Sequence, residues 1–101
     1  MSLSKAQIKF LRGLAQNLSP YVMVGKDGVT DAVTKELKRA LLDHELVKVK
    51  VQEEEKEDFV SVAQKLSDIV GAELVQKIGR MAVYFSQQPD PDKRKIRLPR
   101  G

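Results

Sequence analysis

The sequence has no cysteine and no tryptophan, and it has one histidine among its 101 residues. Without cysteine the chain can form neither a disulfide framework nor a thiolate metal site, and one histidine excludes a histidine-rich metal site. That residue, His44, also lacks a second histidine or a cysteine with which to form a nucleophilic pair, so we expect a structural role for it at a helix end. We therefore predict a protein without metal or cofactor.

Long hydrophobic runs are absent as well. No apolar stretch approaches the roughly 20 residues that span a bilayer, and the N-terminus lacks the apolar segment of a signal peptide. A composition of 42% hydrophobic and 32% charged residues is typical of a globular domain, and a chain of this length suits one domain. The sequence thus predicts a cytoplasmic protein that does not act at a membrane, and we expect a monomer.

Acidic residues are scarce outside one segment. Residues 53–58 (EEEKED) hold five acids and one lysine. The rest of the chain therefore has 17 basic and 9 acidic residues, a net charge of +8. A chain whose acids gather in one place can present a basic face elsewhere, which suits a polyanionic partner. A solvated surface without a partner remains the alternative.

Hydrophobic periodicity predicts three helices and four strands. The expected helices cover residues 5–18, residues 30–43 and a third segment that opens in the acidic run and ends at Gly71 as its C-terminal cap, and the expected strands cover residues 21–24, 46–51, 72–78 and 81–86. Ser4 and Gln7 have the spacing of a capping box for the first helix.

The resulting order, α-β-α-β-α-β-β, predicts an α/β layer fold with a four-stranded mixed sheet packed by helices. The strand at residues 21–24 is apolar on both faces, which favours a central place in the sheet. Residues 1–87 would form this domain. Residues 88–101 contain three prolines and five basic residues, so we expect an extended tail without a core of its own, either ordered on nucleic acid or frayed.

The stretch Val24–Thr30 (VGKDGVT) carries the strongest functional signal. Gly25 and Gly28 flank Lys26 and Asp27, so the turn can adopt positive φ and let a ligand approach the bare backbone. The helix that follows points its unpaired N–H groups and the positive end of its dipole outward. A strand, a glycine turn, a lysine and a helix N-terminus together predict a site for a phosphate group.

Further cations lie on the exposed arcs of two predicted helices and at the turn of the last hairpin. The candidates are Lys5, Lys9 and Arg12 in the first helix, Lys35, Lys38 and Arg39 in the second helix, and Arg80, which a type II′ turn would leave free at the hairpin tip. A solubilising surface and ion pairs within the second helix remain alternatives. Lys48 and Lys50 share one face of their strand, which is either solvated or a further contact.

No pattern of residues favours catalysis. Gly25-Lys26 lacks the G-x-x-x-x-G-K-[ST] spacing of a nucleotide-binding P-loop, and the chain offers no plausible nucleophile–base pair. A KH domain also uses a GxxG loop, but there the loop joins two helices. Here the segment before Gly25 is too short, and too close to Pro20, to be a helix. We therefore predict binding without catalysis and without a small-molecule substrate.

Several motifs follow one another in a fixed order along nearly the whole chain. They are Leu3-Ser4 and Leu14-Ala15, the stretch Val24–Thr30, His44-Glu45-Leu46 with Lys48-Val49-Lys50, Ile78-Gly79, and Arg94-Lys95-Ile96. This ordered set resembles the CRM domain family (chloroplast RNA splicing and ribosome maturation), in particular its small bacterial YhbY-type members. One departure lies at the end of the last strand, where many members have Tyr-Arg and this chain has Tyr84-Phe85.

The resemblance implies a fold similar to the C-terminal domain of translation initiation factor three. It also implies RNA binding through Gly25–Gly28 and the adjacent basic surface, and association with precursors of the large ribosomal subunit. Since aromatic residues make up only 5% of the chain, we expect recognition of the shape and backbone of ribosomal RNA with little base readout. The alternative is a protein-interaction module that docks on a ribosomal protein through the sheet or the first helix.

Overall fold

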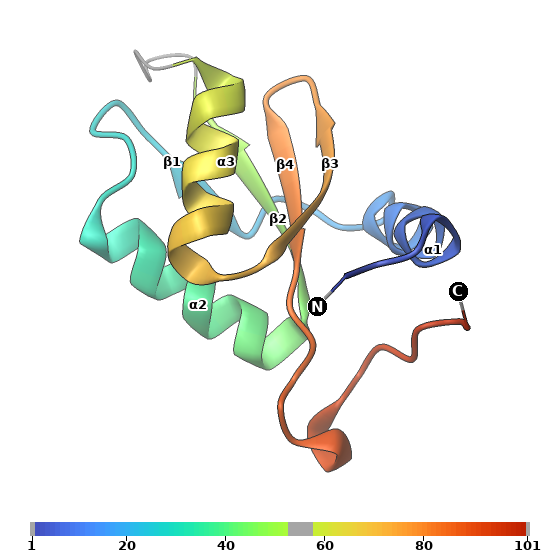
Figure 1. Cartoon of the computed structure of the whole chain (residues 1–101). Coiled ribbons are helices and arrows are strands. Elements are labelled where there is room, and N and C mark those ends of the chain that lie inside the picture. The colour runs from blue at the N-terminus through green and yellow to red at the C-terminus, as the bar shows by residue number, and fades with distance from the viewer. Residues whose placement is uncertain (1, 53–57, 101) are drawn as a thin grey trace.

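The computed structural model describes residues 2–52 and 58–100, and it confirms the predicted order of elements (Figure 1). The elements are α1 (Lys5–Ala15), β1 (Val22–Val24), α2 (Asp31–His44), β2 (Leu46–Val51), α3 (Phe59–Val70), β3 (Glu73–Ile78), β4 (Met81–Phe85) and a short 3-10 helix (Pro91–Lys93). Most of the acidic run expected to open the third helix lies outside the described residues. Its last residue, Asp58, is the N-cap of α3.

The four strands form one mixed sheet in the order β1-β2-β4-β3. β1 pairs with β2 in parallel, whereas β4 is antiparallel to both of its neighbours. β1 is therefore an edge strand, and the prediction of a central place is wrong. Its sequence suggested two buried faces, but Met23, which points away from the face of Val22 and Val24, remains 45% exposed.

Helices cover both faces of the sheet. Side chains of α2 and α3 pack with Val47 and Tyr84 in the larger buried cluster, whereas α1 packs with the neighbouring residues Leu46 and Phe85 in the smaller one. Because consecutive residues of a strand point to opposite faces, α1 and the α2–α3 pair lie on opposite sides of the sheet. This separation decides which cations can act together.

The first helix begins as predicted and ends earlier than predicted. Ser4 and Gln7 form the expected capping box, with each side chain bonded to the other's backbone N–H at 3.0–3.1 Å. Beyond Ala15 the chain tightens, because the N–H groups of residues 16–18 each bond to the carbonyl three residues back. Leu14, in the last turn of α1, is 39% exposed.

The C-terminal segment leaves β4, passes through the 3-10 helix (Pro91–Lys93) and turns back toward α1 (Figure 1). Ile96 and Leu98 pack against the α1 cluster, and the Gln7 side chain donates a hydrogen bond to the carbonyl of Pro99 at 3.0 Å. Apart from the 3-10 helix at Pro91–Lys93 the described part of the segment has no helix or strand, and its apolar side chains complete a cluster of the domain.

Candidate nucleic-acid interface

The glycine motif forms a closed turn between β1 and α2. The Gly28 N–H donates to the Gly25 carbonyl at 3.0 Å, which joins the first and last residues of the turn. Gly28 has a φ of +72°, a conformation that a side chain disfavours, whereas Gly25 does not have positive φ. The two glycines therefore have different roles: Gly28 shapes the turn, and Gly25 keeps its surface bare.

The turn opens onto solvent at the start of α2. Gly25, Lys26, Asp27, Gly28 and Thr30 line a hollow of about 460 Å³, and the Lys26 and Asp27 side chains are exposed. Thr30 is the N-cap of α2, and its hydroxyl oxygen accepts a hydrogen bond from the Val33 N–H at 3.2 Å. The first turn of the helix is thus fixed while its N-terminal end faces the hollow, an arrangement that suits an anion.

Arg80 is not the free cation that the hairpin motif predicted. The hairpin itself is as expected, since Gly79 has φ +58° and Arg80 does not have positive φ, the pattern of a type II′ turn. The Arg80 side chain, however, folds back and donates from Nε to the Val51 carbonyl at 2.8 Å and from Nη2 to the Gln52 carbonyl at 2.6 Å. It braces the end of β2 beside the glycine turn, because the Gln52 N–H in turn bonds to the Val24 carbonyl at 2.8 Å.

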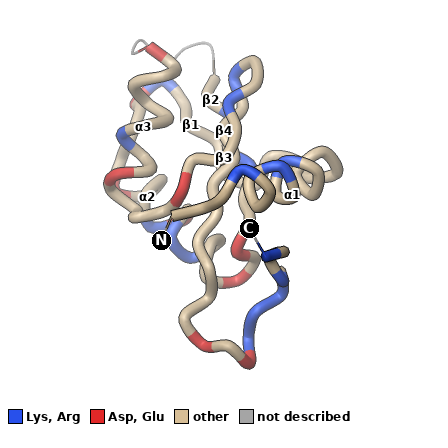
Figure 2. Tube along the Cα trace, turned by 45° about the vertical axis from the view of Figure 1, so that its right-hand side comes forward, with Lys and Arg blue, Asp and Glu red and all other residues tan. Residues whose placement is uncertain are grey.

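The helical cations do not form one track. All six side chains are exposed: Lys5, Lys9 and Arg12 on α1, and Lys35, Lys38 and Arg39 on α2. Since α1 and α2 lie on opposite sides of the sheet, the structure separates the two sets. Figure 2 shows Lys and Arg along α1 and along the C-terminal segment on the side away from α2.

Arg12 has a structural contact that its place in the sequence did not indicate. Its Nε donates to the Val75 carbonyl at 2.9 Å. Val75 lies where the pairing of β3 with β4 shifts register between Leu74 and Gln76, so the ladder is interrupted there. Arg12 thus fastens α1 to the irregular part of β3.

Lys50 lies closer to the glycine turn than the sequence indicated. The pairing register places it in one row across the sheet with Met23, Met81 and Ile78, at the end where β1 enters the turn. Lys50 is exposed, as are Met23 and Ile78, at 45% and 60%. The alternation of residues 46–51 predicted the face of this lysine. Its neighbours depended on strand order and register.

Glu45 is a second residue whose role the sequence did not reveal. It is only 1% exposed and has a φ of +66° at the C-terminal cap of α2. One carboxylate oxygen accepts hydrogen bonds from the N–H groups of Lys95 and Ile96 at 2.6 and 2.9 Å, and the other accepts one from Gln88 at 2.9 Å. A buried carboxylate at the end of α2 therefore holds the C-terminal segment.

The tyrosines differ in what they offer a ligand. Tyr84 is fully buried, its hydroxyl donates to the Ala63 carbonyl at 2.8 Å, and burial raises the pKa of this hydroxyl well above its ordinary value. Tyr21 is 58% exposed, and its ring meets that of His44 edge-on with centroids 5.2 Å apart. Phe85, the residue after Tyr84, is buried in the α1 cluster.

Within residues 2–52 and 58–100, no group of three or more His, Cys, Asp or Glu side chains is arranged to hold a metal ion. In the same ranges no helix combines the length and apolar character needed to cross a membrane.

Comparison with known proteins identifies the class. The family model of the CRS1/YhbY (CRM) domain matches residues 3–85, and the chain belongs to this family. The chain is 38% identical over 93 residues to a probable RNA-binding protein of Pseudomonas aeruginosa, covering 92% of this chain and 89% of that protein. It is also 38% identical over 99 residues to an RNA-binding protein of Haemophilus influenzae, covering 98% and 97% of the two chains.

A solved structure agrees with the fold. The solution structure of a hypothetical protein from Staphylococcus aureus, described as a candidate RNA-binding protein, superposes with a TM-score of 0.80. The two chains are 34% identical, and the match covers 97% of this chain and 100% of the other. The fold class predicted from the order of elements is thereby confirmed.

Proposed function

We propose that this protein binds RNA through the Gly25–Gly28 turn and that its target is ribosomal RNA in precursors of the large ribosomal subunit. The observation that carries the proposal is the solvent-exposed turn at the start of α2, with Lys26 exposed between two glycines. Two relatives that match this chain over nearly its whole length are named as RNA-binding proteins, one of them as a probable one. The ribosomal target is supported by the order of motifs that the chain shares with YhbY-type proteins.

The turn suits the backbone of RNA rather than its bases. A Cβ built on Gly25 would meet only the Gln52 Oε1 at 3.9 Å, an ordinary contact, so the space in front of this residue is open. A phosphate can approach the main chain there, and Lys26 adds a charge that requires no strict geometry. Thr30 and the first turn of α2 extend the site, and Lys35 lies one helical turn after Asp31.

The protein acts in this proposal by binding alone. It needs no cofactor and no small-molecule substrate, and it works as a monomer in the cytoplasm, where ribosomal subunits mature. Crosslinking in cells, followed by sequencing of the attached RNA, tests the target directly. We expect reads to accumulate on large-subunit ribosomal RNA and its precursors. Reads spread over messenger RNA in proportion to abundance would contradict the ribosomal assignment.

A protein-docking function is the second candidate, because the sheet presents apolar side chains at the same end. Met23 and Ile78 are 45% and 60% exposed and flank Lys50 and Met81 in one row. A surface of this kind can meet a ribosomal protein. Association with ribosomal particles that survives nuclease treatment and changes little with salt would favour docking. Loss of association under either treatment would favour RNA.

A further inference from the structure

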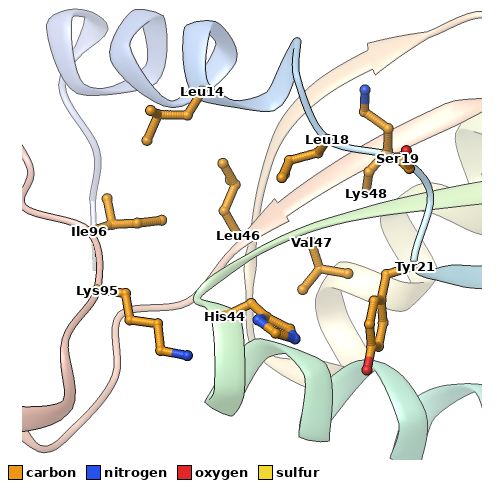
Figure 3. A pocket seen from close by; sticks show the side chains of 10 residues that line it. All are labelled: Leu14, Leu18, Ser19, Tyr21, His44, Leu46, Val47, Lys48, Lys95 and Ile96. Carbon is orange, nitrogen blue, oxygen red and sulfur yellow. The ribbon is translucent and has the colours of Figure 1, made fainter.

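A pocket of about 420 Å³ lies at the start of β1, apart from the glycine turn at its other end (Figure 3). Leu14 and Leu18 line it from the α1 side, and Leu46 forms part of its floor. Tyr21 and His44 line a further part, and Lys48 and Lys95 complete it. None of its ten lining residues is acidic.

The chemistry of the lining is that of a stacking site with cations at its rim. Tyr21 is 58% exposed, so one aromatic ring is available to a ligand without unfolding the domain. His44 meets this ring edge-on and limits its movement, with centroids 5.2 Å apart. Lys48, half-buried on β2, and Lys95, exposed on the C-terminal segment, supply positive charge from two sides.

One wall of the pocket exists because the C-terminal segment is held in place. Lys95 and Ile96 line the pocket with their side chains, while their N–H groups bond to the buried Glu45 carboxylate at 2.6 and 2.9 Å. Glu45 directly follows His44 at the end of α2. Glu45 thus fixes this wall from a position next in the chain to His44, a member of the aromatic pair.

We infer that this pocket binds one unpaired nucleotide of the RNA, with its base against Tyr21 and its phosphate at Lys48 or Lys95. An apolar floor with an exposed ring suits a nucleobase, and two cations without an acid complement the attached phosphate. The inference rests on the proposed function, since it assigns a second contact to the same RNA. It adds base stacking at a place distinct from the backbone contact.

The two contacts are close enough for one strand of RNA. Tyr21 precedes Gly25 by four residues of extended chain, which corresponds to roughly 13 Å at the usual rise of a strand. The cations of α1, which the sheet separates from those of α2, are on the same side of the sheet as Leu18, Leu46 and Ile96 of the pocket. These α1 cations can therefore contact RNA without being part of the phosphate site at the glycine turn.

His44 provides a direct test, because it is the only histidine and its ring signals can be assigned without ambiguity. The protein is titrated with short unstructured oligouridylate, and separately with inorganic polyphosphate and with a blunt RNA duplex, while the His44 ring protons are followed by NMR. We expect a saturable shift with oligouridylate and a much smaller one with polyphosphate or duplex. Equal shifts with all three probes would overturn the base assignment.

Variants provide the second readout. Tyr21→Ala should weaken oligouridylate binding by about fivefold or more, the usual effect of losing one stacked base. Tyr21→Phe should retain most of the affinity, because the ring remains. Ile69→Ala is the matched control, since Ile69 is 48% exposed on α3 across the sheet, and it should bind normally. Equal affinity of Tyr21→Ala and the control would overturn the pocket.

The outcomes separate the pocket from the proposed function. RNA binding that depends on Lys26 while the His44 ring does not respond would overturn the pocket and leave the glycine turn in place. No RNA binding at all would overturn both. A His44 shift that appears only on raising the protein concentration, without RNA, would assign the pocket to a second copy of the chain and overturn the inference.

Discussion

Gly25 and Gly28 are both glycines, but they differ in backbone conformation and in their surroundings. Gly28 has a φ of +72°, so any Cβ there is strained, whereas Gly25 does not have positive φ and has open space in front of it. Substitution at Gly28 is therefore expected to change stability as well as RNA affinity. Substitution at Gly25 is expected to change RNA affinity without loss of stability, so it is the better probe of an approaching phosphate.

We predict that Gly25→Ala leaves the free energy of unfolding unchanged or raises it by up to about 1 kcal/mol, because Ala restricts the unfolded chain. RNA affinity should fall severalfold, because the methyl group occupies the place of the phosphate. Gly28→Ala should instead cost about 1 kcal/mol of stability. Denaturant unfolding and a filter-binding assay on the same samples give both values. A Gly25→Ala protein that binds normally would contradict a backbone approach at this residue.

Tyr84 links stability to alkaline pH. Burial raises the pKa of its hydroxyl in the folded state above the ordinary value of 10.0, which the unfolded chain retains. Below pH 10 both states are protonated and this stabilisation is fully present. Above it the unfolded state loses its proton first, so stability should fall by up to about 1.4 kcal/mol per pH unit.

The matched variant is Tyr84→Phe, which also loses the 2.8 Å hydrogen bond to Ala63 and should be less stable by about 1 kcal/mol at neutral pH. Its stability should depend less on pH above 10 than that of the wild type. Chemical denaturation over a series of pH values measures both effects. Parallel curves of unfolding free energy against pH for the two proteins would contradict a raised pKa of the Tyr84 hydroxyl.

At the scale of elements, the C-terminal segment depends on one carboxylate. Glu45 accepts three backbone hydrogen bonds from Gln88, Lys95 and Ile96, whereas an amide at this position could not accept all three without turning a donor toward an N–H group. We predict that Glu45→Gln releases the segment and lowers the free energy of unfolding by about 1–3 kcal/mol.

Limited proteolysis with trypsin tests the release, because Lys93, Arg94, Lys95 and Arg97 lie in the segment. Cleavage there should be faster in Glu45→Gln than in the wild type under native conditions. Asp68→Asn is the control, since Asp68 is an exposed acid whose hydrogen bond is to Gln64 on the same helix. Equal cleavage in both variants would mean that contacts other than the Glu45 carboxylate, such as the packing of Ile96 and Leu98, hold the segment.

A second contact between elements joins the β3–β4 hairpin to the end of β2 through the Arg80 side chain. Arg80→Ala should lower the free energy of unfolding by about 1–3 kcal/mol, because two charge-assisted hydrogen bonds to main-chain carbonyls are lost. Thermal unfolding measures the loss. Lys77→Ala, an exposed cation of the same hairpin, should be nearly neutral. A destabilisation no larger than that of Lys77→Ala would contradict a structural role for Arg80.

The elements were predictable where one local pattern decided them. The alternation of residues 46–51 gave β2 with its observed bounds, and Gly71 ends α3 with a φ of +70°, as a C-terminal cap should. β1 was placed wrongly at the centre of the sheet, because an apolar run indicates hydrophobicity but does not show whether each face of the strand is buried or exposed. Met23 and Tyr21 illustrate this limit.

At the scale of the whole molecule, the glycine turn was predictable and its surroundings were not. Gly25, Lys26 and Gly28 are consecutive or nearly so, and their geometry follows from local chemistry. Whether Lys9 and Lys35 share a surface depends on which side of the sheet each helix covers, and helical spacing contains no such information. Arg80 and Glu45 were misjudged for the same reason, since their partners lie 28–29 and 43–51 residues away.

The separation of the two basic sides leads to a matched comparison. Lys26→Ala and Lys9→Ala each remove one exposed lysine, from the glycine turn and from α1. With a structured ribosomal RNA fragment, we expect the larger loss of affinity for Lys26→Ala, because the turn holds the backbone directly. A gel-shift assay at one salt concentration ranks them. The reverse ranking would move the main contact to α1.

The central claim, that phosphate is bound at the glycine turn, is tested most directly by the salt dependence of binding for the wild type, Lys26→Ala and the control Lys93→Ala. We predict a log–log slope of roughly −2 to −4 for the wild type, as expected if about three to six phosphates are neutralised. Lys26→Ala should lower its magnitude by about 0.7 to 1, and Lys93→Ala should leave it unchanged. A slope and an affinity that are the same in all three proteins would contradict the claim.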